Sequence, residues 1–190
     1  MDEFEYLAAL MSVVAGLGLA RALSGFASIL DSGRSLIQFD VHIVWTFNIL
    51  IWLVGFWWFT FMLSSIDGWT VSLLLFVLIY GALIYLLVAL LHPNSDKTDT
   101  GSVSGFIVRR RPFFATFIAL GLFDVMDTLI KTELLKLPGP PERSYWILMA
   151  LWIVLGATAW RTTNRIFHRV FAYCWFAITV LWNVSTLGKL

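Results

Sequence analysis

Two carboxylates fall inside a stretch of the chain that is otherwise apolar. Asp124 and Asp127 are three residues apart, so a helix places both on one face, together with Thr128 and Lys131. Ionisable groups inside a membrane segment are costly and often mark a path for ions or protons. One interpretation is therefore an acidic face toward a water-filled cavity. The other is a helix that leaves the hydrocarbon early, with Asp127 and Lys131 as an interfacial ion pair.

Arg21 is the second ionisable residue inside an apolar segment. In a helix it shares a stripe with Gly18, Gly25 and Ser28, so its guanidinium emerges among small residues. Its long side chain could snorkel to the membrane interface. Alternatively, it pairs with a carboxylate on another helix or lines a path for anions. We expect no direct pairing with Asp124, which lies toward the opposite face of the membrane.

The three histidines, His42, His92 and His168, each lie at the end of an apolar segment, and all three are predicted on the same membrane boundary. Histidine binds metal and haem, and two histidines at equal depth on different helices would suit a b-type haem. Histidines at helix ends are more often simply solvated. The sequence therefore predicts no cofactor, with these three as weak candidates for metal or haem ligands.

Two further features point to helix packing. Asn48 stands in an apolar stretch, where we expect an interhelical hydrogen bond. Small residues recur at every fourth position of the first segment, at Ala8, Ser12, Gly16, Ala20, Ser24 and Ser28. Such spacing lets two helix backbones approach closely in lipid. The partner is either another helix of this chain or a second subunit, and the sequence leaves both open.

Composition sets the environment of these residues. The chain has 190 residues, of which 59% are hydrophobic and 13% charged, and its mean hydropathy is +0.84. A soluble domain is about 45–50% apolar and about 25% charged, so we expect a lipid bilayer to cover the excess. A net charge of +1 argues against binding to nucleic acid. The fold class is therefore an all-α polytopic membrane protein.

Hydropathy predicts six transmembrane helices in a single domain that spans residues 1–190. Crossing about 30 Å of hydrocarbon takes roughly 20 residues, and the candidate segments are 4–30, 41–63, 69–91, 112–130, 144–160 and 167–187. His92–Gly105 is expected to be a flexible loop, and Pro112 to lie in the first turn of the fourth helix. Pro138–Pro141 is expected to break the chain before the fifth segment. Tyr145 and Trp146 begin that segment, where aromatic residues prefer the interface.

Lysine and arginine in short loops favour the cytoplasm. One side of the predicted bundle carries eight, at Arg34, Lys97, Arg109, Arg110, Arg111, Arg161, Arg165 and Arg169. The other side carries four, at Lys131, Lys136, Arg143 and Lys189. This bias predicts that both termini lie on the non-cytoplasmic side.

Several short motifs occur in the first part of the chain, namely Glu5-Tyr6-Leu7, Gly16-Leu17-Gly18-Leu19, Leu23-Ser24-Gly25, Trp45 and Trp57-Trp58. In these motifs the chain resembles an uncharacterised family of small polytopic bacterial membrane proteins. They cover roughly the first sixty residues of the sequence. The resemblance implies a bacterial cytoplasmic membrane and a similar number of helices, and it implies no activity and no catalytic residue.

Three functions follow, from different classes. The first is a small channel or transporter for an ion or small solute, assembled as a homo-oligomer, with Asp124 or Arg21 on a wet path. The second is a non-transporting accessory subunit with an unknown membrane protein partner. The third is a haem-binding or lipid-modifying membrane enzyme. No nucleophile, base and orienting residue can be identified together, so we expect that the protein is not an enzyme.

Overall fold

The computed structural model describes residues 3–33, 35–65, 69–93, 103–134 and 143–187. Six α-helices make up most of this part of the chain, which confirms the all-α prediction. They are α1 (Glu3–Asp31), α2 (Asp40–Phe61), α3 (Val71–Leu91), α4 (Val103–Leu129), α5 (Arg143–Arg161) and α6 (Arg165–Leu187). Short helices flank them, namely η1 (Leu36–Phe39), η2 (Met62–Ser65) and a π-helical turn, η3 (Ile130–Leu134), that extends α4.

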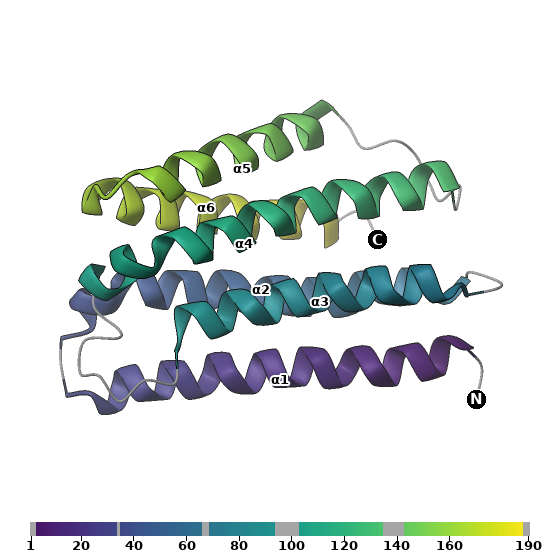
Figure 1. Ribbon diagram of the computed structural model, residues 1–190, viewed down its shortest axis with the longest axis horizontal. Coiled ribbons are helices and arrows are strands. Elements are labelled where there is room, and N and C mark those ends of the chain that lie inside the picture. The colour runs from purple at the N-terminus through teal and green to yellow at the C-terminus, as the bar shows by residue number, and fades with distance from the viewer. Residues whose placement is uncertain (1–2, 34, 66–68, 94–102, 135–142, 188–190) are drawn as a thin grey trace.

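The helices run roughly along one long axis and alternate in direction (Figure 1). Helices α1, α3 and α5 end, and α2, α4 and α6 begin, at the left-hand end of that view. We call it the arginine end, because the described arginines there are Arg109, Arg110, Arg111, Arg161, Arg165 and Arg169. Helix α1 begins and α6 ends toward the opposite side, as an even number of helices that alternate in direction requires.

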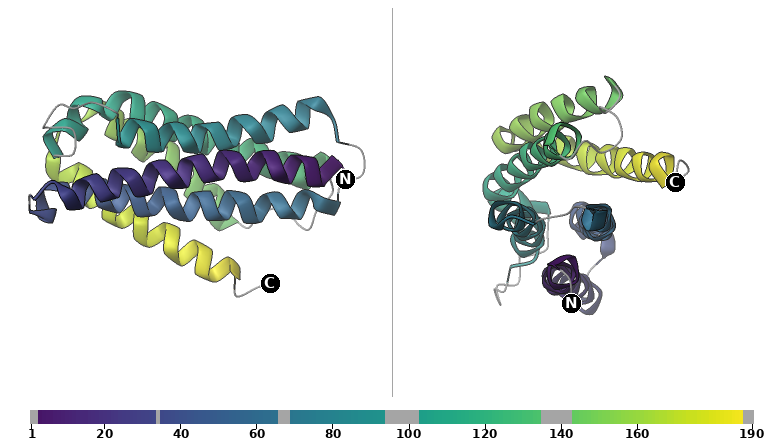
Figure 2. Two further views of the ribbon diagram at one scale, coloured as in Figure 1. Left: turned by 90° about the horizontal axis from the view of Figure 1, so that it is seen from below. Right: turned by 90° about the vertical axis from the view of Figure 1, so that its right-hand side faces the viewer.

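The packing order differs from the chain order. Helix α4 packs mainly on α5 and α3, α1 packs on α3 and α2, and α6 packs on α2. Helices α5 and α6 follow each other directly along the chain but diverge from their junction like the arms of a V (Figure 2). The last helix is therefore held by the first half of the chain rather than by its neighbour.

Four of the described helical stretches are long and apolar enough to cross a membrane: Phe4–Asp31, Leu36–Trp58, Val71–Leu91 and Gly105–Thr132. The prediction of six helices is confirmed, but α5 and α6 do not reach the same standard of length and composition. Helix α5 has 19 residues with an arginine at each end. Helix α6 carries Arg165, His168 and Arg169 in its first five residues. These terminal charges limit the apolar part of each of the two helices.

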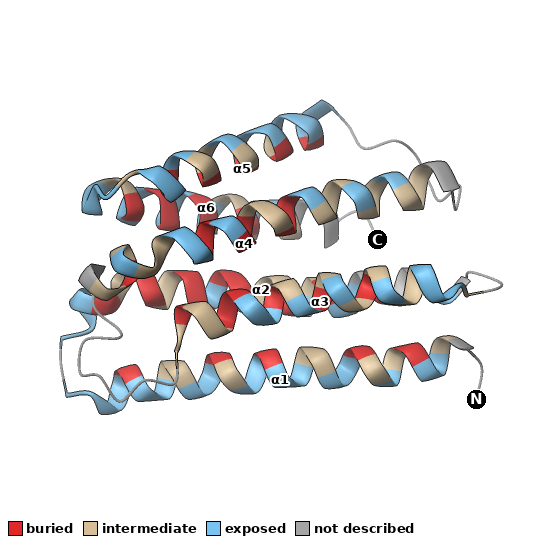
Figure 3. Cartoon of the chain, viewed as in Figure 1, coloured by how far each residue is buried: buried red, intermediate tan, exposed pale blue. Residues whose placement is uncertain are grey.

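Large apolar side chains remain exposed along the helices (Figure 3). Examples from four different helices are Leu17, Val54, Val154 and Leu181. A water-soluble monomer rarely exposes extended apolar patches. The exposed surface is therefore compatible with a membrane location.

The beginning of α4 corrects the predicted fourth segment. The helix starts at Val103, not at Pro112, so the Arg109–Arg111 triplet and Pro112 lie in its interior. An interior proline costs about 3 kcal/mol, because it lacks an N–H and its ring crowds the preceding turn. The rings of Phe106 and Phe113, on either side of Pro112, are buried, and their burial offsets part of this cost. Residues 94–102 of the predicted loop, residues 66–68 and the Pro138–Pro141 break lie outside the described residues.

A cluster of aromatic rings fills the centre of the bundle. The ring of Trp45 on α2 is fully buried and meets Phe113, Phe117 and Phe171 edge-on, with centroid distances of 5.2 to 5.7 Å. The stacked pair of Trp52 and Trp152, 5.2 Å apart, continues this cluster toward α5. Edge-on and stacked geometries are the ones that aromatic quadrupoles favour. The rings join α2, α4, α5 and α6 into one core.

Candidate functional site

Helix α4 brings Asp124 between two tyrosines from neighbouring helices. The hydroxyl of Tyr80 on α3 donates to Oδ1 of Asp124 at 2.8 Å. The hydroxyl of Tyr145 on α5 lies 2.9 Å from Oδ2 of the same carboxylate. Each oxygen of one carboxylate is thus paired with a phenol from a different helix. Hydrogen bonds to a charged acceptor are about twice as strong as neutral ones, so this arrangement ties three helices together.

Thr128 extends the cluster into a chain of hydroxyl groups. Its Oγ1 lies 2.8 Å from the hydroxyl oxygen of Tyr145. A phenol has one proton to donate, so Tyr145 donates to an ionised Asp124 and accepts from Thr128. When Asp124 is protonated, it can itself donate to one of the phenols. We call Tyr80, Asp124, Thr128 and Tyr145 the Asp124 cluster.

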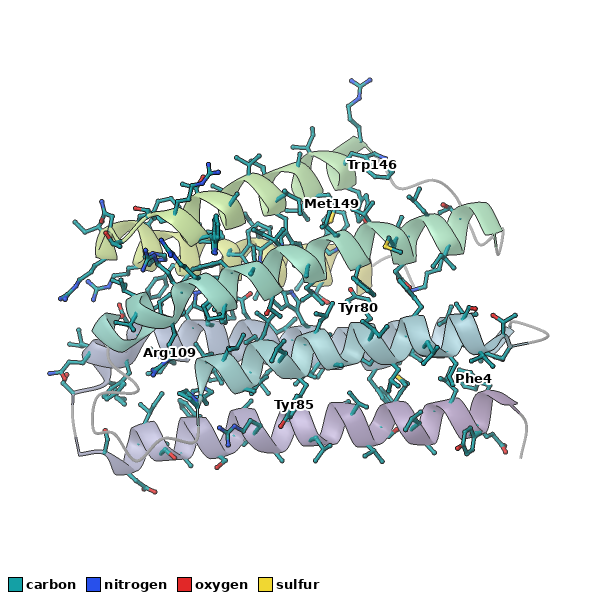
Figure 4. The ribbon with its side chains drawn as sticks, viewed as in Figure 1. Phe4, Tyr80, Tyr85, Arg109, Trp146 and Met149 are labelled. Carbon is teal, nitrogen blue, oxygen red and sulfur yellow. The ribbon has the colours of Figure 1, made fainter. Side chains whose placement is uncertain are left out.

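The depth of the Asp124 cluster follows from Tyr80. Nine residues of α3 precede Tyr80 and eleven follow it, so its Cα lies near the middle of a helix about 31 Å long. Figure 4 shows Tyr80 near the centre of the bundle, on the side that faces α4. The hydrogen bond from its hydroxyl places the carboxylate of Asp124 inside the bundle rather than at a helix end. That the acidic face of α4 meets a water-filled cavity stays a prediction.

Asp127 and Lys131 form the expected pair along the helix. Nζ of Lys131 lies 2.6 Å from Oδ2 of Asp127, and the two side chains are 17% and 18% exposed. Helical structure continues beyond Asp127 to Leu134. The pair is therefore mostly covered and sits one turn beyond Asp124.

Sequence reasoning found the two aspartates but missed both tyrosines. Tyr145 was expected to anchor at the membrane interface, yet it is buried and points into the bundle, whereas its neighbour Trp146 is exposed. Tyr80 stands within an apolar helix, and a buried phenol normally has a hydrogen-bond partner. In the sequence, Tyr80 could therefore be recognised only as a phenol that needs a hydrogen-bond partner. The identity of the partner depends on how α3 and α4 pack.

Arg21 lies toward the arginine end and does not approach the Asp124 cluster. Its guanidinium donates to the backbone carbonyl of His92, which follows the last residue of α3. Carbonyls at the end of a helix lack partners within the helix. Arg21 on α1 therefore caps α3.

The ring of His92 has contacts with two neighbouring helices, α2 and α1. Its Nε2 lies 2.8 Å from Oγ1 of Thr46, and its ring packs against Gly25, where a Cβ would come within 2.2 Å of it. Burial, and next the charge of Arg21, lower the pKa of His92 from 6.5 to about 4. The imidazole is therefore neutral at physiological pH. Because Thr46 engages its Nε2, that nitrogen is not open to a haem iron.

His42 and His168 also lie at the arginine end, as predicted. The ring centroid of His42 is 6.3 Å from that of His92. The ring of His168 stacks on Phe114, and its Nε2 lies 3.0 Å from the carbonyl oxygen of Thr162. Among the described residues, no group of three or more histidine, cysteine, aspartate or glutamate side chains is placed to hold a metal ion.

The two packing predictions have different outcomes. Asn48 is fully buried, but neither amide atom has a hydrogen-bond partner among the described residues. The expected interhelical bond is therefore not seen there. The small-residue ladder lies mostly on the outside of α1, with Ser12, Gly16, Ala20, Ser24 and Ser28 exposed. The face that packs within the chain is instead Leu7, Met11, Gly18, Ala22 and Ile29. A seam between subunits stays a prediction.

Comparisons of the chain with protein-family models, with curated proteins and with solved structures find no match. The family resemblance of the first sixty or so residues therefore stays a prediction.

Proposed function

We propose that this chain is a small transporter of the bacterial cytoplasmic membrane, and that Asp124 is its proton-binding site. The observation that supports it is the carboxylate of Asp124, which two phenols hold within the bundle at 2.8 and 2.9 Å. Carboxylates at membrane depth commonly serve as proton relays. In this proposal all six helices cross the bilayer, including α5 and α6.

The chemistry of the neighbours favours a proton over a metal cation. A cation needs several oxygen acceptors that point toward it. In the Asp124 cluster, the hydroxyls of Tyr80 and Tyr145 instead use the carboxylate oxygens as their acceptors. A chain from Thr128 through Tyr145 to Asp124 can reverse its direction when the carboxyl gains a proton. Proton uptake therefore needs no change in the positions of these heavy atoms.

Proton flux in liposomes tests the proposal. We expect purified protein to acidify vesicles that enclose a pH-sensitive dye when a potassium gradient with valinomycin sets the driving force. The substitution Asp124→Asn keeps the shape of the side chain but cannot ionise, and it should lower the flux at least tenfold. Asp31→Asn is the matched control, because it removes the same charge at the exposed end of α1. Wild-type flux from Asp124→Asn would overturn the proposal, provided that the variant elutes as a folded species.

A second candidate, the non-transporting accessory subunit, is favoured by the aromatic cluster. Rings from four helices, among them Trp45, Phe117 and Trp152, fill the middle of the bundle. A subunit that only holds a partner in place would have such a dry interior. A stable stoichiometric partner in affinity purification, together with flux no greater than that of empty liposomes, would favour this function over transport.

A further inference from the structure

His42 is a buried imidazole without hydrogen bonds to the described part of the chain. It lies in the first turn of α2, at the arginine end, and is 1% exposed. Neither Nδ1 nor Nε2 has a partner among the described residues. A buried donor left unsatisfied costs about 1–3 kcal/mol. Such a residue therefore points to a group that is not part of the described protein.

One arginine lies near this imidazole, and another lies near the neighbouring imidazole of His92. Arg109 on α4 lies close enough to His42 to act on it electrostatically, and Arg21 acts on His92 in the same way. Figure 4 shows Arg109 near the beginning of α4, at the left-hand end of the bundle. Asp40, a carboxylate at this end, lies 2.5 Å from Arg169, so its charge is already paired. Two guanidiniums near the two imidazoles disfavour a metal cation between them and favour an anion.

More buried nitrogens without partners among the described residues belong to His168 on α6 and Arg110 on α4. The ring of Phe106 is 5.5 Å from that of His42 and 5.7 Å from that of His168. Within the described ranges, Nδ1 of His168 and Nε of Arg110 are also buried without partners. Together with those of His42, these make four such nitrogens around one phenylalanine.

We propose that the arginine end binds a phosphate group, with His42 at its base and Arg109 at its rim. Arginine and imidazole are suited to phosphate, which has several acceptor oxygens that point in different directions. His42 is buried, whereas Arg109 and Arg110 are only half-buried, which is why we place the arginine at the rim. The phosphate belongs to a lipid headgroup or is free in solution. Basic pockets between membrane helices bind lipid headgroups in this way.

Thermal unfolding of the purified chain tests this site with two probes. In a neutral detergent, potassium phosphate is compared with potassium chloride at equal ionic strength. In nanodiscs, phosphatidylcholine alone, in which the choline cation offsets the charge of the phosphate, is compared with phosphatidylcholine plus phosphatidylglycerol, in which the phosphate keeps a net negative charge. We expect one of the two probes to raise the Tm by about 5 °C when the site is saturated. A rise with inorganic phosphate identifies free phosphate as the ligand, and a rise with phosphatidylglycerol alone identifies the headgroup.

Three variants decide whether the rise comes from this site. His42→Phe keeps a planar ring but removes both nitrogens, and Arg109→Gln removes the guanidinium at the rim; each should abolish the rise. Arg111→Gln is the matched control, because it removes the same charge from an exposed residue two positions further along α4. It should keep the rise. If His42→Phe does not fold, the comparison of Arg109→Gln with Arg111→Gln decides.

Two results would overturn the proposal. The first is the absence of a rise with both probes, which would mean that water satisfies the nitrogens of His42. The second is an equal loss in Arg109→Gln and Arg111→Gln, which would mean that the effect is general surface charge. Neither result bears on proton flux through Asp124, because that test uses a different residue in the interior of the bundle.

Discussion

At the scale of single residues, the hydroxyl of Tyr80 is expected to stabilise the fold through Asp124. Tyr80→Phe removes one donor from the buried carboxylate and should lower the free energy of unfolding by about 1.5–3 kcal/mol, the usual value for a hydrogen bond to a charged group. Tyr85→Phe is the control, since Tyr85 lies on the same helix and is 38% exposed. It should cost less than about 0.5 kcal/mol.

Reversible unfolding in mixed micelles, followed by circular dichroism, measures both changes. Equal losses in the two variants would contradict the role of the Tyr80–Asp124 bond. In the background of Asp124→Leu, the penalty of Tyr80→Phe should largely disappear, because the two residues are coupled and their effects are not additive.

The sequence predicted only some of the residues in and around the Asp124 cluster. The sequence indicated Asp124, Asp127 and Lys131, because charges stand out in an apolar segment and because spacing along one helix is fixed. It did not indicate that Tyr80 and Tyr145 hold Asp124. Those contacts join helices whose rotation and depth depend on packing. The same limit applies to Arg21, whose acceptor is a backbone carbonyl and so has no signature in the sequence.

At the scale of elements, two glycines of α1 have opposite roles. A Cβ at Gly25 would come within 2.2 Å of the ring of His92, while a Cβ at Gly16 would have nothing within 4 Å. Gly25→Ala should therefore destabilise the protein by about 1–3 kcal/mol. Gly16→Ala, in the same helix, should be neutral or stabilising by up to about 1 kcal/mol.

The measurement is again the free energy of unfolding of both variants. The ring of His92 has little room to retreat, because Thr46 holds its Nε2 and Arg21 holds its carbonyl. A Gly25→Ala protein as stable as the wild type would show that α1 does not pack on the end of α3 as described.

The fourth helix shows why element boundaries differ from hydropathy boundaries. Three arginines followed by Pro112 suggested a helix start, since proline is favoured in the first turn. The helix nevertheless begins nine residues earlier, at Val103. Phe106 becomes buried between His42 and His168, and this contact comes from α2 and α6. A hydropathy profile of α4 alone contains no information about it.

At the scale of the whole molecule, the arginine end is predicted to face the cytoplasm. In a background of Cys174→Ser, Ser35→Cys and Ser144→Cys place single thiols at exposed positions of opposite ends. A membrane-impermeant maleimide should label Ser144→Cys in intact spheroplasts and label Ser35→Cys only after lysis. The reverse pattern would invert the topology. Labelling of both in intact spheroplasts would argue against a membrane-spanning bundle.

The divergence of α5 and α6 has a consequence for biogenesis. The ring of Phe171 on α6 packs on Trp45 of α2. The last helix to be synthesised therefore covers a side of a helix that is synthesised early. Until α6 has left the ribosome, Trp45 lacks its contact with the ring of Phe171. That side of α2 then stays accessible to lipid or to a chaperone. If all six helices cross the bilayer, as proposed, a stop codon in the loop after α5 would leave five inserted segments with this flank uncovered. Such a nascent product would be a natural target for membrane quality-control proteases.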